Sequence, residues 1–440
     1  MLLRFGVSNT LSICSYQEIS LAAAPSLRSE KGHVIDVNNA SVRNKSFLPV
    51  LGIYGANAAG KSNVLAALHF LIDSITDSYT HSLSRKKPMP YQPARIDVSE
   101  RTAPSHFDVD VLIDGVRHHY GFEHDAEGVT REWLYSFPSN ARKVLFMRDF
   151  SAGNAEQSVY FGPTIKRIDP TLSEQSKNRW CLFLSAASAL NHEQLSAVAK
   201  YFEQHFDVFG AVKAANNRQL AMVLQDERSR QEIEAFLSRV DVGILGIKIE
   251  KKPAEKKMRD AVLGMGKALA EAFGNSMPID AFAEIAEFDY DIRFVHRGKN
   301  EVSFELPTSA ESSGTLHLLS ILMPTIEAIK EGKVLVIDEI TTSLHTMLSQ
   351  ELIKLFVTPE INTKGAQFIF TTHDTNLLSS GFLRRDEIWF AEKGHFGETH
   401  VYPLSDFHTR SSDNLERGYL QGRFGAIPFF GDVNSLFSAQ

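Results

Sequence analysis

A glycine-rich octapeptide near the start of the chain has the residue types needed to hold phosphate. Residues 55–62 read GANAAGKS, which fits the pattern G-x-x-x-x-G-K-[ST]. In such a loop successive backbone N–H groups close around phosphate oxygens, and side chains at the glycine positions would block that approach. Lys61 would reach the β- and γ-phosphates, and the Ser62 hydroxyl would be a ligand of Mg²⁺. The residues predicted to bind the nucleotide are Gly55, Asn57, Gly60, Lys61 and Ser62.

The sequence on either side of this loop supports the prediction. An apolar run over 47–54 precedes it and predicts a strand, whereas residues 63–75 have a helical pattern. The helix would begin at Lys61 and add its positive end to the anion site. A glycine-rich turn that only joins a strand to a helix is the alternative, and the complete pattern disfavours it.

Two carboxylates follow a second apolar run. Residues 333–339, KVLVIDE, predict a buried strand that ends in Asp338 and Glu339, where strand ends meet ligands in an α/β sheet. Asp338 suits the Mg²⁺ shell through water, and Glu339 is placed to orient or deprotonate the water that attacks the γ-phosphate. An Asp-Glu pair after a strand is common by itself, and it gains meaning only beside the phosphate loop.

Two further segments provide polar groups for the same chemistry. Residues 367–374, QFIFTTHD, predict a strand that ends at His373, whose imidazole could face the γ-phosphate. Residues 311–315, ESSGT, open an amphipathic helix over 316–329 and form a second anion-binding surface. Taken alone, such a histidine is more often structural, and such a serine is more often a helix cap. The residues predicted at this second surface are Ser312, Ser313 and Gly314.

The composition is that of an ordinary globular protein. The chain has 440 residues with 43% hydrophobic content, which is enough for a large core and for two or three lobes. Its net charge of −7 argues against a protein that coats nucleic acid along its whole surface, although a local basic patch is compatible with it. Two cysteines, Cys14 and Cys181, are too few for a disulfide framework and fit a reducing cytoplasm.

Neither a membrane span nor export is expected. No apolar run approaches the roughly 20 residues that a span needs. Residues 1–24 have one early arginine and an alanine-rich end, as a signal peptide would, but Asn9, Gln17 and Glu18 interrupt the apolar stretch. A strand and a hairpin at the edge of a sheet are expected there instead, in a cytoplasmic protein.

The rest of the chain predicts both strands and helices. Strands are expected at 2–7, 19–23, 106–113, 116–123, 132–137, 143–147, 242–249, 288–295 and 301–306. A turn at Asp114-Gly115 would join two of them into a hairpin. Helical periodicity extends over about 171–239, with an apolar face that includes Phe206, and again over 256–273. The long helical stretch is expected to form an inserted lobe.

These motifs, in this order, resemble the ABC-type ATPase core of transporter motors and SMC-like repair proteins. That family has a Walker A loop, a signature motif, a Walker B strand, a D-loop and a switch histidine. The matching positions are Lys61 and Ser62, the degenerate signature 312–315, Asp338 and Glu339, residues 343–345, and His373. Gln92 lies about where the family has its Q-loop glutamine, which would be a further metal ligand.

The resemblance implies an α/β fold, namely a P-loop NTPase of ABC ATPase type with an antiparallel β subdomain and an inserted helical lobe. The expected organisation is an N-terminal part of the ATPase domain at 1–165, a mainly helical insertion at 166–285 and a C-terminal part at 286–440. The Walker motifs are 338 − 61 = 277 residues apart, which leaves room for the insertion. ATP with Mg²⁺ would bind between two subunits, so a homodimer or a higher homo-oligomer is expected.

A closer resemblance is to soluble AAA-family ATPases of the ABC fold from bacterial anti-phage systems. It rests on the start FGVSN, the motif ESSGT, the runs TTHDTN and DEIWF, and the tail ERGYLQGRFGAIP. Members include the ATPase subunit of the PARIS system, which the chain resembles most, the Septu-type ATPase and abortive-infection ATPases. The resemblance implies an ATP-hydrolysing sensor and scaffold that controls a separately encoded nuclease effector, with a phage-encoded protein as its trigger.

Other functions stay open at this level. An SMC-like ATPase in DNA repair or recombination would have the same motifs, and the neighbouring gene would distinguish the two. A small-molecule kinase leaves residues 312–315 and His373 unexplained. The basic segments 85–87 and 248–259 are candidate contacts with DNA or a partner, although solvated surface explains them equally well. The glycines and aromatic residues of 418–430 are expected to pack against the sheet.

Overall fold

The chain forms two compact units in its computed structural model. The described residues are 1–27, 33–37, 41–96, 101–151, 158–166, 168–211, 217–240, 243–273, 287–342, 344–410 and 413–428. The first unit comprises Met1–Ala211 and Ala328–Gln440, and the second comprises Val212–Glu327. The helical insertion expected at 166–285 overlaps the second unit only from residue 212, because the helices before it pack in the first unit.

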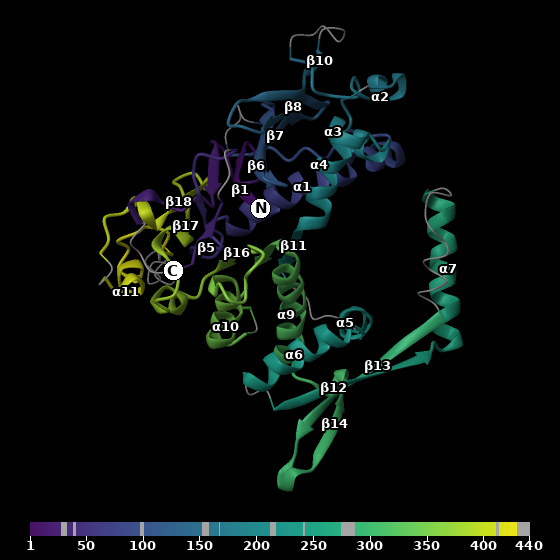
Figure 1. Cartoon of the computed structure of the whole chain (residues 1–440), viewed down its shortest axis with the longest axis vertical. Helices are drawn as coiled ribbons and strands as arrows, with labels where there is room; N and C mark the ends of the chain where they lie inside the picture. The colour runs from purple at the N-terminus through teal and green to yellow at the C-terminus, as the bar shows by residue number, and fades with distance from the viewer. Residues whose placement is uncertain are drawn as a thin grey trace, which may run out of the picture. The chain divides into compact units, whose positions relative to one another are not determined.

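A six-stranded sheet in the first unit leads into the phosphate loop (Figure 1). Its order is β11-β15-β16-β5-β17-β18, and all neighbours are parallel except β17 and β18. The strands are β5 Val50–Tyr54, β11 Phe206–Ala211, β15 Val334–Asp338, β16 Gln367–Thr372, β17 Ile388–Lys393 and β18 Thr399–Pro403. Every residue of β5 and β16 is buried, as expected for central strands of a parallel sheet.

The first unit also contains a seven-stranded antiparallel sheet of order β10-β9-β8-β7-β6-β1-β2. Its strands are β1 Leu2–Ser8, β2 Gln17–Ser20, β6 Ser105–Ile113, β7 Val116–Asp125, β8 Gly128–Phe137, β9 Lys143–Asp149 and β10 Val159–Phe161. Asp114 and Gly115 have φ angles of 47° and 76°, as the two-residue turn of a hairpin requires. Two short strands, β3 Ile35–Asp36 and β4 Ser46–Phe47, pair separately. The predicted mixed α/β fold with an antiparallel sheet is confirmed.

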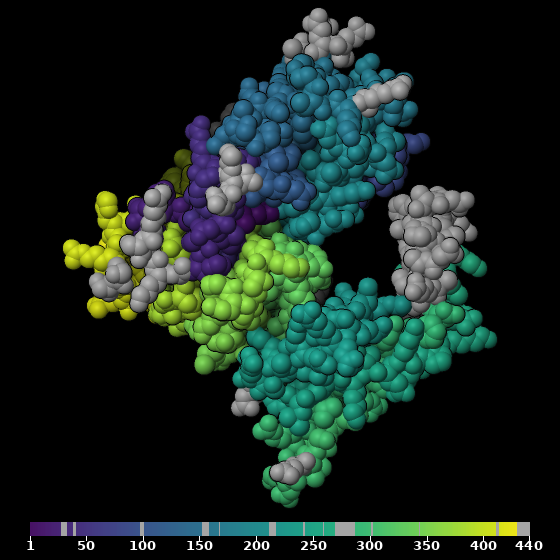
Figure 2. All heavy atoms as spheres, in the orientation of Figure 1, coloured from purple at the N-terminus to yellow at the C-terminus, as the bar shows by residue number. Residues whose placement is uncertain are grey.

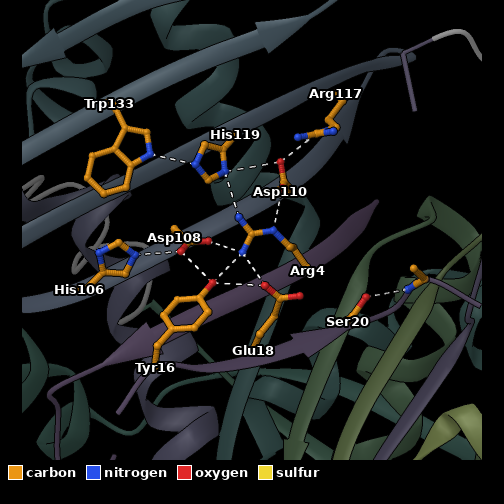
Figure 3. Close-up of polar contacts among 11 residues, drawn as sticks. Arg4, Tyr16, Glu18, Ser20, His106, Asp108, Asp110, Arg117, His119 and Trp133 are labelled. Atoms are coloured by element: carbon orange, nitrogen blue, oxygen red, sulfur yellow. Dashed lines mark hydrogen bonds and ion pairs between the residues drawn. The ribbon is translucent and has the colours of Figure 1, made fainter. Parts of the chain in front are cut away.

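One face of the antiparallel sheet carries a polar network (Figure 3). The Arg4 guanidinium on β1 contacts the Asp108 carboxylate at 2.5 Å and the Asp110 carboxylate at 2.6 Å, both on β6. His106 pairs with Asp108 at 2.9 Å. Burial alone would raise the pKa of Asp110, but the hydrogen bond from His119 and the Arg4 charge lower it to about 2. These side chains therefore hold β1, β6 and β7 together on the face opposite the core.

Helices of the first unit pack beside these sheets. They are α1 Lys61–Arg85, α2 Pro170–Gln175, α3 Phe183–Ala189, α4 Glu193–His205, α10 Thr346–Val357 and α11 Leu415–Leu420. A fully buried ion pair of Glu132 and Arg148, 2.6 Å apart, links β8 and β9. Glu132 also accepts the N–H groups of Phe183 and Leu184 at 2.8 and 3.1 Å. Since the buried carboxylate is paired and hydrogen-bonded, it can tie the sheet to the start of α3.

The stability of the chain is expected to fall as the pH is lowered from about 6.5 towards 4, because of His124. This histidine on β7 is 1% exposed, and its ring stacks on that of Phe70 with 5.4 Å between centroids. Burial lowers its pKa to about 4, whereas a histidine in an unfolded chain titrates near about 6.5. Between these values the unfolded chain binds more protons, so the free energy of unfolding falls by up to about 1.4 kcal/mol per pH unit.

Urea unfolding of the wild type and of His124→Phe at about pH 7.5 and about pH 5 measures this effect. The variant should lose the extra pH dependence. His395→Asn changes an exposed histidine and should keep the pH dependence of the wild type. The same pH dependence in the wild type and His124→Phe would contradict the prediction.

The second unit is a mixture of helices and strands. Its helices are α5 Asn217–Leu224, α6 Glu227–Arg239 and α7 Lys256–Phe273, together with most of α9 Ser313–Glu331. Its sheet has the order β12-β13-β14, with β12 Ile244–Pro253, β13 Phe288–Arg297 and β14 Ser303–Pro307. Helix α6 packs against β12, and α5 packs against β13.

The structure confirms the predicted helix 256–273 and corrects the placement of Phe206. The helix predicted over 256–273 is confirmed as α7. The placement of Phe206 on a helical face is wrong, because α4 ends at His205 and Phe206 opens β11, which pairs in parallel with β15. Val242 and Phe429, which were expected in a strand and in the packed tail, lie outside the described residues. No described helix has the length and hydrophobicity that a membrane span requires.

Candidate active site

The carboxyl ends of three neighbouring parallel strands bring together Lys61, Glu339 and His373. Lys61 begins α1 seven residues after the end of β5, Glu339 follows β15, and His373 follows β16. The Glu339 carboxylate lies 3.5 Å from the Lys61 ammonium and 2.8 Å from Nδ1 of His373. Lys61 is buried, while the His373 ring is largely exposed. Residues 312 positions apart in sequence, from 61 to 373, thus form one polar cluster at the sheet edge.

Thr371 contacts the carboxylate of Asp338 and the backbone of Glu339. Its buried hydroxyl donates to Oδ1 of Asp338 at 2.5 Å and accepts the backbone N–H of Glu339 at 2.8 Å. The threonine stands at the end of β16, beside β15, so a parallel neighbour strand orients the two acids. A hydroxyl is suited to this position because it donates and accepts at the same time.

The backbone of Glu339 is in a strained conformation. Its φ angle is 56°, in the left-handed region that residues with a Cβ rarely adopt. Such a conformation costs on the order of 1 kcal/mol and persists only where the surroundings hold it. The Thr371 hydroxyl on its N–H provides one such contact. In this conformation the Glu339 carboxylate lies 3.5 Å from the Lys61 ammonium.

The phosphate loop is supported from the side of β18. Thr399 donates through its hydroxyl to the carbonyl of Ala59 at 3.1 Å, and its Oγ1 lies 2.7 Å from Oγ of Ser12. Asn63 in α1 donates to the same Ser12 hydroxyl at 2.6 Å. Gly60 has a φ of 98°, and a Cβ there would clash with the Thr399 side chain. Glycine is therefore required at position 60 for both conformation and space.

Lys61 closes the loop from within. Its ammonium donates to the carbonyls of Gly55 and Ala56 at 2.9 and 3.1 Å, so the side chain curls back over the loop. Asn57 and Ser62 are exposed beside it. This arrangement holds a cation against the loop carbonyls, next to the position expected for a phosphate.

The predicted metal ligands Ser62, Asp338 and Gln92 come from three different segments. Ser62 begins α1 with an exposed side chain, and Asp338 lies at the end of β15, where hydroxyl and carboxylate oxygens suit Mg²⁺. Gln92 is exposed in the segment after α1, and its backbone carbonyl accepts the N–H of Leu11 and the hydroxyl of Thr10. The hydrogen bonds described for Gln92 thus join it to the N-terminal loop.

The predicted second anion surface belongs to the other unit. The Ser312 hydroxyl accepts the N–H of Thr315 at 3.0 Å and lies 2.8 Å from the Thr315 hydroxyl, which is the geometry of a helix cap for α9. Ser313 is exposed, and Gly314 is partly buried. The arrangement satisfies the start of α9 and leaves the Ser313 hydroxyl at the surface. Of the expected D-loop, Ser343 lies outside the described residues.

A pocket of about 950 Å³ lies beside the phosphate loop. Its lining includes residues of the loop, His373 and Thr375 after β16, the end of β17, and the C-terminal segment around Tyr419 and Ile427. In Figure 2 the last part of the chain, in yellow, lies beside the first part, in purple, and Val401 donates its N–H to the Gln17 side chain at 2.9 Å. Residues within 419–428 thus form part of the wall of this pocket.

Sequence reasoning left out several residues that shape this site. These residues are far apart in the chain, so the sequence did not show that they meet, and the only local indication for Thr371 is the pair of threonines that ends its strand. The glycine and aromatic pattern of the tail predicted packing against the sheet but not a contact with the phosphate loop. The missed residues are Ser12, Thr371, Thr375, Glu392, Thr399, Glu416 and Tyr419.

Comparison with known proteins gives three findings. The family described as "AAA domain, putative AbiEii toxin, Type IV TA system" matches residues 50–379. No curated protein matches the chain. Among solved structures, the chain is similar to the SMC head domain from Thermotoga maritima, with a TM-score of 0.39 and 13% identity, over 91% of this chain and 98% of that one.

Proposed function

Because the chain belongs to the family described as "AAA domain, putative AbiEii toxin, Type IV TA system", we propose that it is an ATP-hydrolysing sensor and scaffold of bacterial anti-phage defence. The convergence of Lys61, Glu339 and His373 carries the ATPase part of this proposal. A cation held against the phosphate loop, next to a carboxylate and an imidazole, suits transfer of a γ-phosphoryl group to water. The resemblance to anti-phage ATPases supports the biological role.

The residues have distinct tasks in hydrolysis. Lys61 exchanges the carbonyls of Gly55 and Ala56 for the β- and γ-phosphates, and the loop N–H groups hold the remaining oxygens. Glu339 orients the attacking water and accepts its proton, and His373 faces the γ-phosphate while it holds the Glu339 carboxylate. Ser62 and Asp338 would hold Mg²⁺, which when bound neutralises charge that develops on the phosphates.

In the proposed cycle ATP joins two copies of the chain. Each copy has one phosphate loop and one Ser312–Thr315 segment, and the exposed Ser313 at the start of α9 would meet nucleotide held by the other copy. The homodimer would hold a separately encoded nuclease, which a phage-encoded protein releases or activates. Hydrolysis would then reset the pair.

The test uses the Glu339→Gln chain, tagged and purified with ATP from cells that carry the native neighbouring genes. Mass spectrometry should identify a nuclease-like protein in stoichiometric amount, and light scattering should show a dimer only with ATP. Lys61→Ala is the matched control and should be monomeric with or without ATP. DNA-repair proteins or chromosomal DNA in place of a nuclease would overturn the defence role and favour an SMC-like ATPase of repair.

A further inference from the structure

The C-terminal segment 413–428 is held firmly against the sheet that leads into the phosphate loop. The Tyr419 ring stacks on Phe390 of β17, with 5.5 Å between centroids and 7° between planes, and Phe424 stacks on the same ring at 5.7 Å. Tyr419 and Phe424 are 5% and 1% exposed, respectively. Tyr402 of β18 donates to the carbonyl of Phe424 at 2.9 Å. The segment is thus anchored by a core of its own.

One end of this segment is hydrogen-bonded to the phosphate loop. The Ala426 carbonyl accepts the backbone N–H of Ala56 at 3.1 Å and the Tyr419 hydroxyl at 2.8 Å. The Ala426 N–H donates to the Glu392 carboxylate at 3.2 Å. Ala426 has a φ of 57°, so its backbone is held in a strained conformation that aims the carbonyl at the loop.

The other end of the segment is hydrogen-bonded to the loop of the imidazole. Thr375 stands two residues after His373, and its hydroxyl donates to the Glu416 carboxylate at 3.2 Å. Glu416 lies in α11, whose start Asn414 caps by accepting the N–H of Arg417 at 2.8 Å. Both Thr375 and His373 line the pocket that the segment closes.

We propose that the segment 413–428 positions the catalytic groups, with Glu416 and Tyr419 as positioning residues. The proposal rests on the ATPase function proposed above. One rigid, packed element touches the backbone of the phosphate loop and the segment that carries His373, so it sets the separation between the γ-phosphate and the imidazole. A displacement of about 1 Å between reacting groups can lower a rate by up to 10²-fold, which makes such an element matter for turnover.

Loss of the Thr375–Glu416 hydrogen bond should slow turnover without weakening ATP binding. Glu416→Ala removes the acceptor for the Thr375 hydroxyl and should lower kcat for ATP about tenfold. The KM for ATP should stay within about twofold, because no phosphate contact is lost. Glu416→Gln keeps an oxygen acceptor and should restore kcat to within about twofold of the wild type. Tyr419→Phe removes only the hydroxyl that holds the Ala426 carbonyl and should also lower kcat.

A double-mutant cycle separates positioning from a merely structural role. Thr375→Val removes the donor of the Thr375–Glu416 hydrogen bond, and Glu416→Ala removes its acceptor. Since each change abolishes the same hydrogen bond, the double variant should have the same kcat as either single variant. The expected result is a kcat loss in both single variants, no added loss in the pair, rescue by Glu416→Gln and unchanged thermal unfolding. Additive losses, failure of rescue, or a kcat of Glu416→Ala equal to the wild type would overturn the proposal.

The wild type distinguishes this inference from the function on which it rests. Binding of a fluorescent ATP analogue and phosphate release are measured in parallel for every chain. A wild type that neither binds nor hydrolyses ATP removes the proposed function. A wild type that hydrolyses ATP, with a Glu416→Ala chain that does so equally well, removes only the positioning role of the segment.

Discussion

Glu339→Gln should lower kcat for ATP by about 10²- to 10⁴-fold while nucleotide binding persists. The carboxylate lies between Lys61 and His373, at 3.5 and 2.8 Å, where an attacking water would lie close to the γ-phosphate. Glutamine has nearly the same shape but cannot accept a proton at neutral pH, so binding contacts remain and base catalysis is lost. Phosphate release under saturating ATP measures kcat, and a fluorescent ATP analogue measures binding.

The control for this experiment is Glu351→Gln, a change of the same kind on α10. The Glu351 side chain is 49% exposed and pairs with Lys354 of the same helix, at 2.6 Å. It should leave both kcat and binding unchanged. If Glu339→Gln turned over at the wild-type rate, another group would have to activate the water, and the assignment of Glu339 would be wrong. Loss of binding together with kcat would instead place Glu339 in nucleotide recognition.

Lys61→Ala should weaken binding of ATP by about 100-fold or more. Two charge-assisted hydrogen bonds to phosphate oxygens are lost, each worth about 1.5–3 kcal/mol, or roughly a factor of 10 to 100. The ammonium is 4% exposed and already lies within 3.1 Å of the two loop carbonyls of Gly55 and Ala56, so it is preorganised next to the phosphate position. Titration with a fluorescent ATP analogue measures the dissociation constant.

Because Lys61 is buried, the folding of its variant must be checked separately. Lys61→Ala removes the ion pair between the Lys61 ammonium and the Glu339 carboxylate. The midpoint of thermal unfolding shows whether the variant remains folded. Lys364→Ala changes an exposed lysine and should bind ATP like the wild type. Unchanged ATP affinity in Lys61→Ala would show that the loop 55–62 is not the nucleotide site.

The sequence by itself determined the local parts of the candidate site. Position 60 has a φ of 98°, and a Cβ there would clash with Thr399, so glycine is required. The glycine spacing of the loop therefore indicates its backbone conformation from consecutive residues alone. Runs of apolar residues before Asp338 and before His373 predicted strands, and the strands end at 338 and 372, one residue before the predicted ends. Such patterns can be recognised in the sequence because local backbone preference and burial depend on the types of consecutive residues.

Tertiary structure alone decided which distant residues meet at that site. Thr371 holds Asp338 across two parallel strands, and the carbonyl of Ala426 reaches the N–H of Ala56 from 370 positions further along the chain. The spacing of Phe206 from the preceding apolar residues predicts a helix, yet Phe206 opens β11, which pairs in parallel with β15. A hydrogen bond between distant residues needs only one donor and one acceptor, so it produces no repeating pattern in the sequence. Which donor meets which acceptor depends on how the whole core packs.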